Sequence, residues 1–296
     1  MVRKTMEELN LLDDFMFQAV ISRGEEGAEV CRILLNTILG MHLTRVRVVA
    51  QKVFTGTEYL QHGIRLDAYV EDISKENMLA YDGEAEVTVM PDIYDIEPHC
   101  GYDKDSLPKR TRYYNALIDS KVLDAGDAYQ KLRKVVIIMI LPYDPFGENR
   151  MMYTIKNMCV ENPKMEYEDG CKKIFLYTKG KTSSQSLKEM VEYMADSNVE
   201  HVTNQDIEMI HRTVSKVRRD KEVSIGYMKS WEIEAMRREE GRKEGREEGR
   251  EEVMGTLIES LQEVGISKED IIAKLKRKFS LSDEQAERNM EQYYKA

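Results

Sequence analysis

The segment from Lys134 to Gly147, KVVIIMILPYDPFG, constrains the fold more than any other part of the chain. Its apolar residues are continuous rather than alternating, which is typical of a strand that is covered on both faces. Pro142 ends the run, since proline has no N–H to donate to a sheet ladder. Such a strand needs neighbours on both edges and helices on both faces, so it predicts an α/β fold in which helices flank a mixed sheet.

The remaining periodicity supplies the other layers of this fold. Apolar residues at helical spacing predict two helices within Met6–Leu39, a third over 107–123, and more helices after Lys181. Shorter alternating or β-branched runs between turn-forming residues predict strands. These strands are expected at Leu43–Val53, Ile64–Val70, Met78–Val87, 152–160 and 171–180.

The composition changes beyond Trp231, where MRREEGRKEGREEGREEV repeats a four-residue unit. The interior glycine of each repeat costs about 1 kcal/mol of helix stability relative to alanine. No apolar seam runs through the repeat, so a charged spacer is favoured over a partner-binding arm or coiled coil. The expected parts of the chain are an α/β domain (1–230), a charged helix or linker (231–255) and a small helical segment (256–296).

Charge and hydropathy exclude some classes of protein. None of the apolar runs approaches the length that spans a bilayer, and the amino terminus MVRKTMEELNLLDDFMF acquires acids before a signal-like apolar core develops. A cytoplasmic protein without a membrane partner is therefore expected. The formal net charge of −10 argues against general coating of nucleic acid, although a local basic patch is compatible with it.

Carboxylates occupy strand positions in the segment RLDAYVEDISKENMLAYDGEAEV. Asp67 lies in one predicted strand, whereas Asp82, Glu84 and Glu86 lie on one face of the next. If the two strands form a hairpin, Asp67 lies beside Glu84. Crowded like charges are unfavourable unless a hard divalent cation such as Mg²⁺ or Mn²⁺ lies among them. The alternative is an acidic edge strand that discourages sheet-to-sheet pairing, and spacing alone favours neither interpretation.

Several short segments follow one another in a distinctive order: LNLLDDFMF, RLDAYVED, YDGEAEV, LPKRTRYYNALIDSKVLDAGDAYQKLRKVVIIMILPYDPFG, YTIKNMCVEN, DGCKKIFLYTKG and GRKEGREEGREE. Through these segments the sequence resembles, along most of its length, the PD-(D/E)XK nuclease family transposases, also called recombination-promoting nucleases. The resemblance implies a restriction-endonuclease-like core over 1–230, with a mixed sheet flanked by helices. A helical, charged C-terminal extension follows this core.

The resemblance also implies roles for particular residues. Its pattern has an acid on one strand and an acid-x-Lys or acid-x-Gln pair on the neighbouring strand, which implies that Asp67 and Glu84 bind the metal ion. Glu86 falls where the pattern has Gln or Lys. A carboxylate there can act only as a further metal ligand or as a base, so all three acids are expected at the catalytic metal site. The adjacent His99 and Cys100 lack a partner pair at metal-binding spacing and are expected to be surface-loop residues.

The helix that begins PKRTRYY is expected to bring positive charge to these acids. Arg110 and Arg112 are the candidate catalytic cations. Together with Lys109 and Tyr113, they are also expected to contact nucleic acid. The alternative is that these side chains only solvate the helix while its apolar side packs into the core.

Together these features predict a DNA endonuclease that uses Mg²⁺ or Mn²⁺ to hydrolyse phosphodiester bonds in recombination or transposition. The alternative, from a different class, is a catalytically degenerate nuclease fold that binds nucleic acid or acts as a scaffold. The acidic net charge and Glu86 favour this alternative. A third interpretation is a homo-oligomer that assembles through the C-terminal extension.

Overall fold

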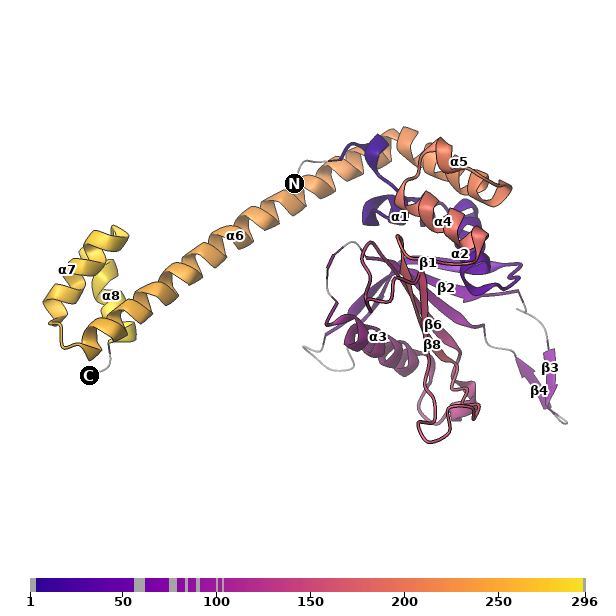
Figure 1. Cartoon of the computed structure of the whole chain (residues 1–296), viewed down its shortest axis with the longest axis horizontal. Helices are drawn as coiled ribbons and strands as arrows, with labels where there is room; N and C mark the ends of the chain where they lie inside the picture. The colour runs from indigo at the N-terminus through magenta and orange to yellow at the C-terminus, as the bar shows by residue number, and fades with distance from the viewer. Residues whose placement is uncertain are drawn as a thin grey trace. The chain divides into compact units, whose positions relative to one another are not determined.

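The computed structural model describes residues 4–55, 62–74, 79–82, 85–88, 91–99, 101–102 and 104–294. The chain divides into two compact units, Met1–Ile225 and Gly226–Ala296 (Figure 1). The first unit is a mixed α/β structure and the second is helical. Of the helices in the described part of the chain, none is both long and apolar enough to cross a membrane.

The first unit is built on a sheet that has six strands among the described residues. Their bounds are β1 (Val46–Phe54), β2 (Ile64–Asp72), β5 (Ile93–Pro98), β6 (Val135–Leu141), β7 (Met152–Ile155) and β8 (Cys171–Tyr177). The order across the sheet is β1-β2-β5-β6-β8-β7. β5, β6 and β8 run parallel, whereas β1–β2, β2–β5 and β7–β8 are antiparallel pairs. The sheet is therefore mixed, as predicted.

β6 lies at the centre of this sheet. It pairs with β5 on one edge and with β8 on the other. All of its residues are buried, because helices cover both faces and no position of the strand faces water. The prediction of a central strand that is covered on both faces is confirmed.

Helices lie on both faces of the sheet (Figure 1). Their bounds are α1 (Asp14–Ile21), α2 (Glu25–Leu39), α3 (Leu107–Val122), α4 (Gln185–Ala195) and α5 (Gln205–Arg219). Figure 1 shows α3 on one face, and α1, α2, α4 and α5 gathered on the other. Leu117 and Ile118 of α3 belong to the same buried cluster as Ile137 of β6. The predicted helices within Met6–Leu39, over 107–123 and after Lys181 are confirmed.

The segment between β2 and β5 differs from its prediction. Met78–Val87 is expected to be one strand paired with Ile64–Val70, but it contains β3 (Leu79–Asp82) and β4 (Ala85–Thr88), which form a separate two-stranded sheet. The neighbours of β2 are instead β1 and β5. The expected pairing is wrong: β5, whose residues are all buried, occupies the edge of β2 that the prediction gave to Met78–Val87.

The second unit is a cluster of three helices in the described chain. α6 (Lys221–Glu263) begins in the first unit and includes the whole charged repeat; α7 (Lys268–Phe279) and α8 (Asp283–Tyr293) follow it. Its buried core consists of Met254, Ile258, Ile271, Leu275 and Met290. The unit therefore packs around the carboxyl-terminal part of α6, beyond the repeat.

Two glycines of α6 predict opposite effects of the same substitution. Gly249→Ala should stabilise the helix by up to about 1 kcal/mol, because its Cβ would meet no atom within 4 Å. Gly255→Ala should gain little or lose stability, since its Cβ would lie 2.8 Å from Tyr293 Cδ1 and displace the ring. Thermal unfolding followed by circular dichroism at low protein concentration measures both. Equal stabilisation by the two substitutions would contradict the close packing of α6 on α8.

Candidate functional site

Acidic side chains from two neighbouring strands gather at one position in the sheet. β2 and β5 pair in the register Ala68↔Ile96, so Asp67 lies opposite Glu97 one step further along. The Asp67 backbone N–H donates to the Glu97 carboxylate at 2.7 Å. Asp95 precedes Glu97 by two residues on β5 and shares its face of the sheet. These three residues are called the acidic cluster below.

The acidic cluster is buried to an extent that is rare for carboxyl groups. Asp95 is 0% exposed and Glu97 is 2% exposed. Within the described residues, no N–H donor reaches the Asp95 carboxyl, and burial, followed by its contact with the Glu97 carboxyl, raises the pKa of Asp95. Buried charges in proteins are normally paired or bound to a metal ion, so the surroundings of Asp95 do not stabilise its ionised form.

Burial raises the pKa values of all three groups. Loss of hydration, reinforced by the charge of Asp67, raises the pKa of Glu97 to about 8. Loss of hydration and the charge of Asp14 raise the pKa of Asp67 to about 6. The pKa of Asp95 is also raised, first by burial and then by repulsion from Glu97. At neutral pH, and without a cation, the acidic cluster therefore retains bound protons.

Arg110 of α3 contacts the acidic cluster directly. Its Nη2 lies 3.5 Å from Glu97 Oε2, and its Nη1 lies 3.4 Å from His99 Nδ1. Its Nε donates to the Tyr114 hydroxyl at 2.8 Å, which holds the guanidinium in place. The positive charge lowers the pKa of Glu97 but does not offset burial and repulsion. Arg110 thus brings positive charge to buried acids, as expected of this helix, but the acid that it contacts is Glu97.

The other residues expected to contact nucleic acid lie on the outer part of α3. Lys109 and Arg112 are exposed. Tyr113 is 37% exposed, and its hydroxyl donates to the backbone carbonyl of His62. The opposite side of the helix is buried in the core, for example at Leu117. α3 therefore combines a structural side, a cation at the acidic cluster and an exposed basic surface.

Helix α1 brings two further polar side chains to Asp67. Besides burial, the charge of Asp14 raises the pKa of the Asp67 carboxyl, whereas the nearby Gln18 amide lowers it. The amide nitrogen and oxygen of Gln18 are buried, and neither makes a hydrogen bond of good geometry in the described chain. α1 contacts β1 and β2, and its buried side includes Met16 and Phe17. This packing is what carries the two polar residues to the acidic cluster.

Asp67 is predicted from the sequence, whereas Asp95 and Glu97, the other two residues of the acidic cluster, are not, although a signal for them exists. The segment IYDIEPH alternates, so Asp95, Glu97 and His99 fall in one row. His99 lies in the loop after β5, as expected, but it is partly buried rather than fully at the surface, and its backbone N–H donates to the Ile140 carbonyl at 2.9 Å. Cys100 lies outside the described residues.

The sheet order removes the reason for predicting that Glu84 and Glu86 are metal ligands beside Asp67. Glu84 lies outside the described residues, and Glu86 lies in β4, where it pairs with Tyr81 of β3. Their expected approach to Asp67 depends on a hairpin between 64–70 and 78–87, and that pairing is wrong. The acid opposite Asp67 is Glu97 because β5, rather than β4, is the neighbour of β2.

The donor chemistry of the acidic cluster suits a hard divalent cation. Carboxylate oxygens are the ligands that Mg²⁺ and Mn²⁺ prefer, and no N–H donor occupies the Asp95 oxygens among the described residues. In the described chain, no three His, Cys, Asp or Glu side chains already converge at metal-binding distances. To share one ion, the carboxyl groups must therefore turn toward a common point.

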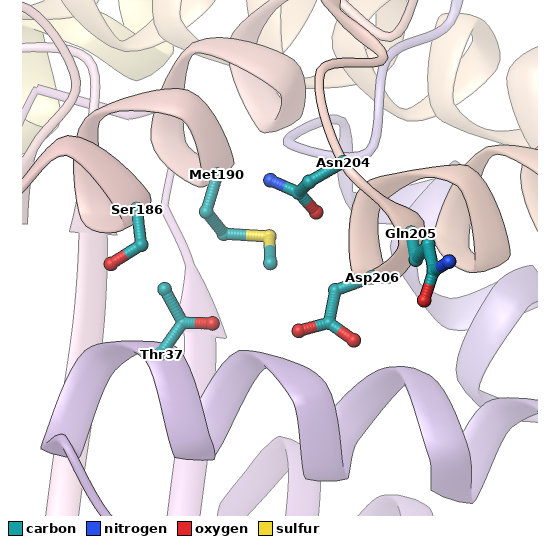
Figure 2. Close-up of a pocket in the computed structure, with 6 residues that line it drawn as sticks. All are labelled: Thr37, Ser186, Met190, Asn204, Gln205 and Asp206. Carbon is teal, nitrogen blue, oxygen red and sulfur yellow. The ribbon is translucent and has the colours of Figure 1, made fainter.

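A separate polar pocket lies among the helices α2, α4 and α5 (Figure 2). Its volume is about 430 Å³, and it is lined by Thr37, Ser186, Met190, Asn204, Gln205 and Asp206. Figure 2 shows the Asp206 carboxylate and the Thr37 hydroxyl pointing toward each other across it. Among these lining residues only Asp206 carries an ionisable side chain, so the pocket lacks the set of acids found in the acidic cluster.

Comparison with protein families, with curated proteins and with solved structures finds no match for this chain. The acidic cluster and Arg110 are therefore the basis on which function is inferred.

The raised pKa of Glu97 predicts a pH-dependent stability. Between its ordinary value of 4.5 and about 8, the folded chain holds a proton that the unfolded chain releases. Without a divalent cation, the free energy of unfolding should thus fall as pH rises through this window. Each pKa unit is worth about 1.4 kcal/mol, so the loss is a few kcal/mol.

Glu97→Gln removes this titration and should flatten the pH dependence. Urea unfolding at about pH 5 and about pH 8.5 with a chelator present measures the difference. The exposed Glu200 provides a matched control, since Glu200→Gln makes the same chemical change away from the cluster. An unchanged slope in Glu97→Gln would contradict the burial of this carboxyl group.

Proposed function

We propose that the first unit is a divalent-metal-dependent DNA endonuclease of the PD-(D/E)XK type, which hydrolyses phosphodiester bonds in recombination or transposition. One observation carries the proposal: Asp67 and Glu97 lie opposite each other on neighbouring strands of a mixed sheet, in one buried cluster with Asp95. The sequence resemblance supports it, and so does a six-stranded sheet with helices on both faces. A restriction-endonuclease-like fold is part of the proposal.

In this proposal the second acid of the family pattern is Glu97 rather than Glu84. Glu97 on β5, the neighbour of β2, and His99 just beyond the end of β5 form an acid-x-His pair, where the pattern has acid-x-Lys or acid-x-Gln. Arg110 lies within 3.5 Å of Glu97 and supplies the positive charge that a lysine would bring. Arg110 can therefore replace the charge of the missing lysine, whereas the Glu86 carboxylate cannot.

Each residue of the site then has a chemical role. A bound Mg²⁺ or Mn²⁺ lowers the pKa of a water molecule and neutralises charge on the phosphate. Asp67, Asp95 and Glu97 would hold the ion. Arg110 would orient the Glu97 carboxylate and face the phosphate, while Gln18 favours the ionised form of Asp67. The exposed Lys109 and Arg112 of α3 would bind the DNA backbone, together with Tyr113.

A second function is favoured by a specific observation. The carboxyl groups do not already converge on a metal-binding point among the described residues, and a histidine follows the second acid where the pattern has Lys or Gln. Both features suit a degenerate nuclease fold that binds nucleic acid or serves as a scaffold. This alternative predicts DNA binding without cleavage.

Plasmid nicking with Mg²⁺, with Mn²⁺ and with a chelator tests the proposal. Asp67→Asn and Glu97→Gln should each lower metal-dependent nicking by about a hundredfold or more, because each removes a ligand of the ion. Glu86→Gln should leave nicking within about threefold of the unmodified chain, since β4 is not a neighbour of β2. DNA binding without any nicking would select the degenerate module. If only Glu86→Gln abolished nicking, Glu86 rather than Glu97 would be the metal ligand, and the hairpin expected from the sequence would be favoured.

The cation requirement is tested separately through α3. Arg110→Ala should lower single-turnover cleavage by about a hundredfold, because the guanidinium contacts Glu97 and faces the phosphate. His99→Lys should change this rate little, since Arg110 already provides the charge. The exposed Arg112 provides a control: Arg112→Ala should weaken DNA binding in a salt-dependent manner without changing the rate at saturating DNA. Equal rates for Arg110→Ala and Arg112→Ala would contradict the role of Arg110.

A further inference from the structure

Residues 239–252 of α6, called the charged repeat below, form four rows along the helix. Residues four apart lie nearly above one another, and each residue advances about 100° around the axis. The rows are glycine (241, 245, 249), arginine (242, 246, 250), glutamate (240, 244, 248, 252) and mixed (239, 243, 247, 251). The glycine row therefore has the arginine row on one side and the glutamate row on the other.

The charged repeat has little packing of its own. Residues 236 to 248 are all exposed. Within the repeat, Arg242 pairs with Glu239 at 2.5 Å, and Arg250 lies over the Phe279 ring. A helix that is polar on every side depends on side-chain pairs or on a partner for its stability in water. The surface of residues 239–248 is thus available to a partner of complementary charge, whereas Arg250 already donates to the Phe279 carbonyl.

We propose that the charged repeat pairs with the charged repeat of a second copy of this chain, in parallel and in register. In a parallel pair with two-fold symmetry, the arginine flank of one copy lies beside the glutamate flank of the other. In an antiparallel pair, the symmetry places each flank beside its own equivalent, so arginine meets arginine and glutamate meets glutamate. Charge complementarity therefore selects both the partner and its direction.

The same symmetry selects the row at the centre of the contact. The central row of a symmetric pair meets its own copy. The arginine and glutamate rows would each meet like charge, and the mixed row would place Glu247 against Glu247. The glycine row carries no charge, and it lets the two axes approach. Rows of residues four apart run alongside each other when two helices cross at about −50°, which is a common packing angle.

The first test measures association of the full-length chain by sedimentation equilibrium at about 50 mM and about 500 mM NaCl. Glu244→Arg with Glu248→Arg makes both flanks positive, and Arg242→Glu with Arg246→Glu makes both negative. Each double variant should raise the dissociation constant at least about tenfold, and an equimolar mixture should restore association.

A matched control changes charge on the far side of the helix. Glu247→Arg with Glu251→Arg alters the mixed row by the same charge and should leave the dissociation constant within about threefold of the unmodified chain. Circular dichroism checks that each variant keeps its helix. An unmodified chain that remains monomeric at about 100 µM in low salt would overturn the proposal, as would equal weakening by the control.

The second test measures direction by disulfide trapping. In the parallel pair Gly241→Cys should cross-link to itself, and so should Gly249→Cys, with the linked peptides identified by mass spectrometry. An antiparallel pair centred on Gly245 would link residue 241 to residue 249 only when the two variants are mixed. That result would overturn the proposal. The inference does not depend on the nuclease function proposed above.

Discussion

The complete burial of β6 determines much of the first unit. A strand without a solvent face needs a partner on each edge, and both partners, β5 and β8, run parallel to it. A parallel pair requires a crossover, and α3 lies in the connection from β5 to β6. The helix begins soon after β5 ends, so its first turns return above the end of that strand. Arg110 meets Glu97 for this reason.

Features that depend on local periodicity could be predicted from the sequence. The apolar run of β6 and the helical spacing of α3 are each contained in one short segment, so both were predictable. Strand pairing depends on contacts between distant segments, so it was not predictable from local periodicity. The acids of IYDIEP lower its apparent tendency to form a strand, although Ile93, Tyr94 and Ile96 alternate with them. Asp67 could be selected from its strand alone, whereas its partner Glu97 required the sheet order.

The acidic cluster opposes the stability of the unit that contains it. Two of its carboxyl groups are almost fully buried, and Arg110 contacts one of them. Residues selected only for stability would place apolar side chains here, as the neighbouring strand β6 does. Strongly perturbed carboxyl groups are concentrated at functional sites, because burial and like charge are what make such groups reactive or cation-binding. The apolar core around β6 offsets the free energy that burial of the acidic cluster costs the unit.

The bound protons of the acidic cluster have a consequence for whatever cation enters it. In the metal site proposed above, the ion would not enter a site that is already fully anionic at neutral pH; it would replace protons on Glu97 and Asp95. Its affinity would then rise by about tenfold per pH unit for each proton displaced, and the heat measured by calorimetry would change with the ionisation enthalpy of the buffer. Because protons leave as the ion enters, the net charge of the acidic cluster would change by less than the full charge of the ion.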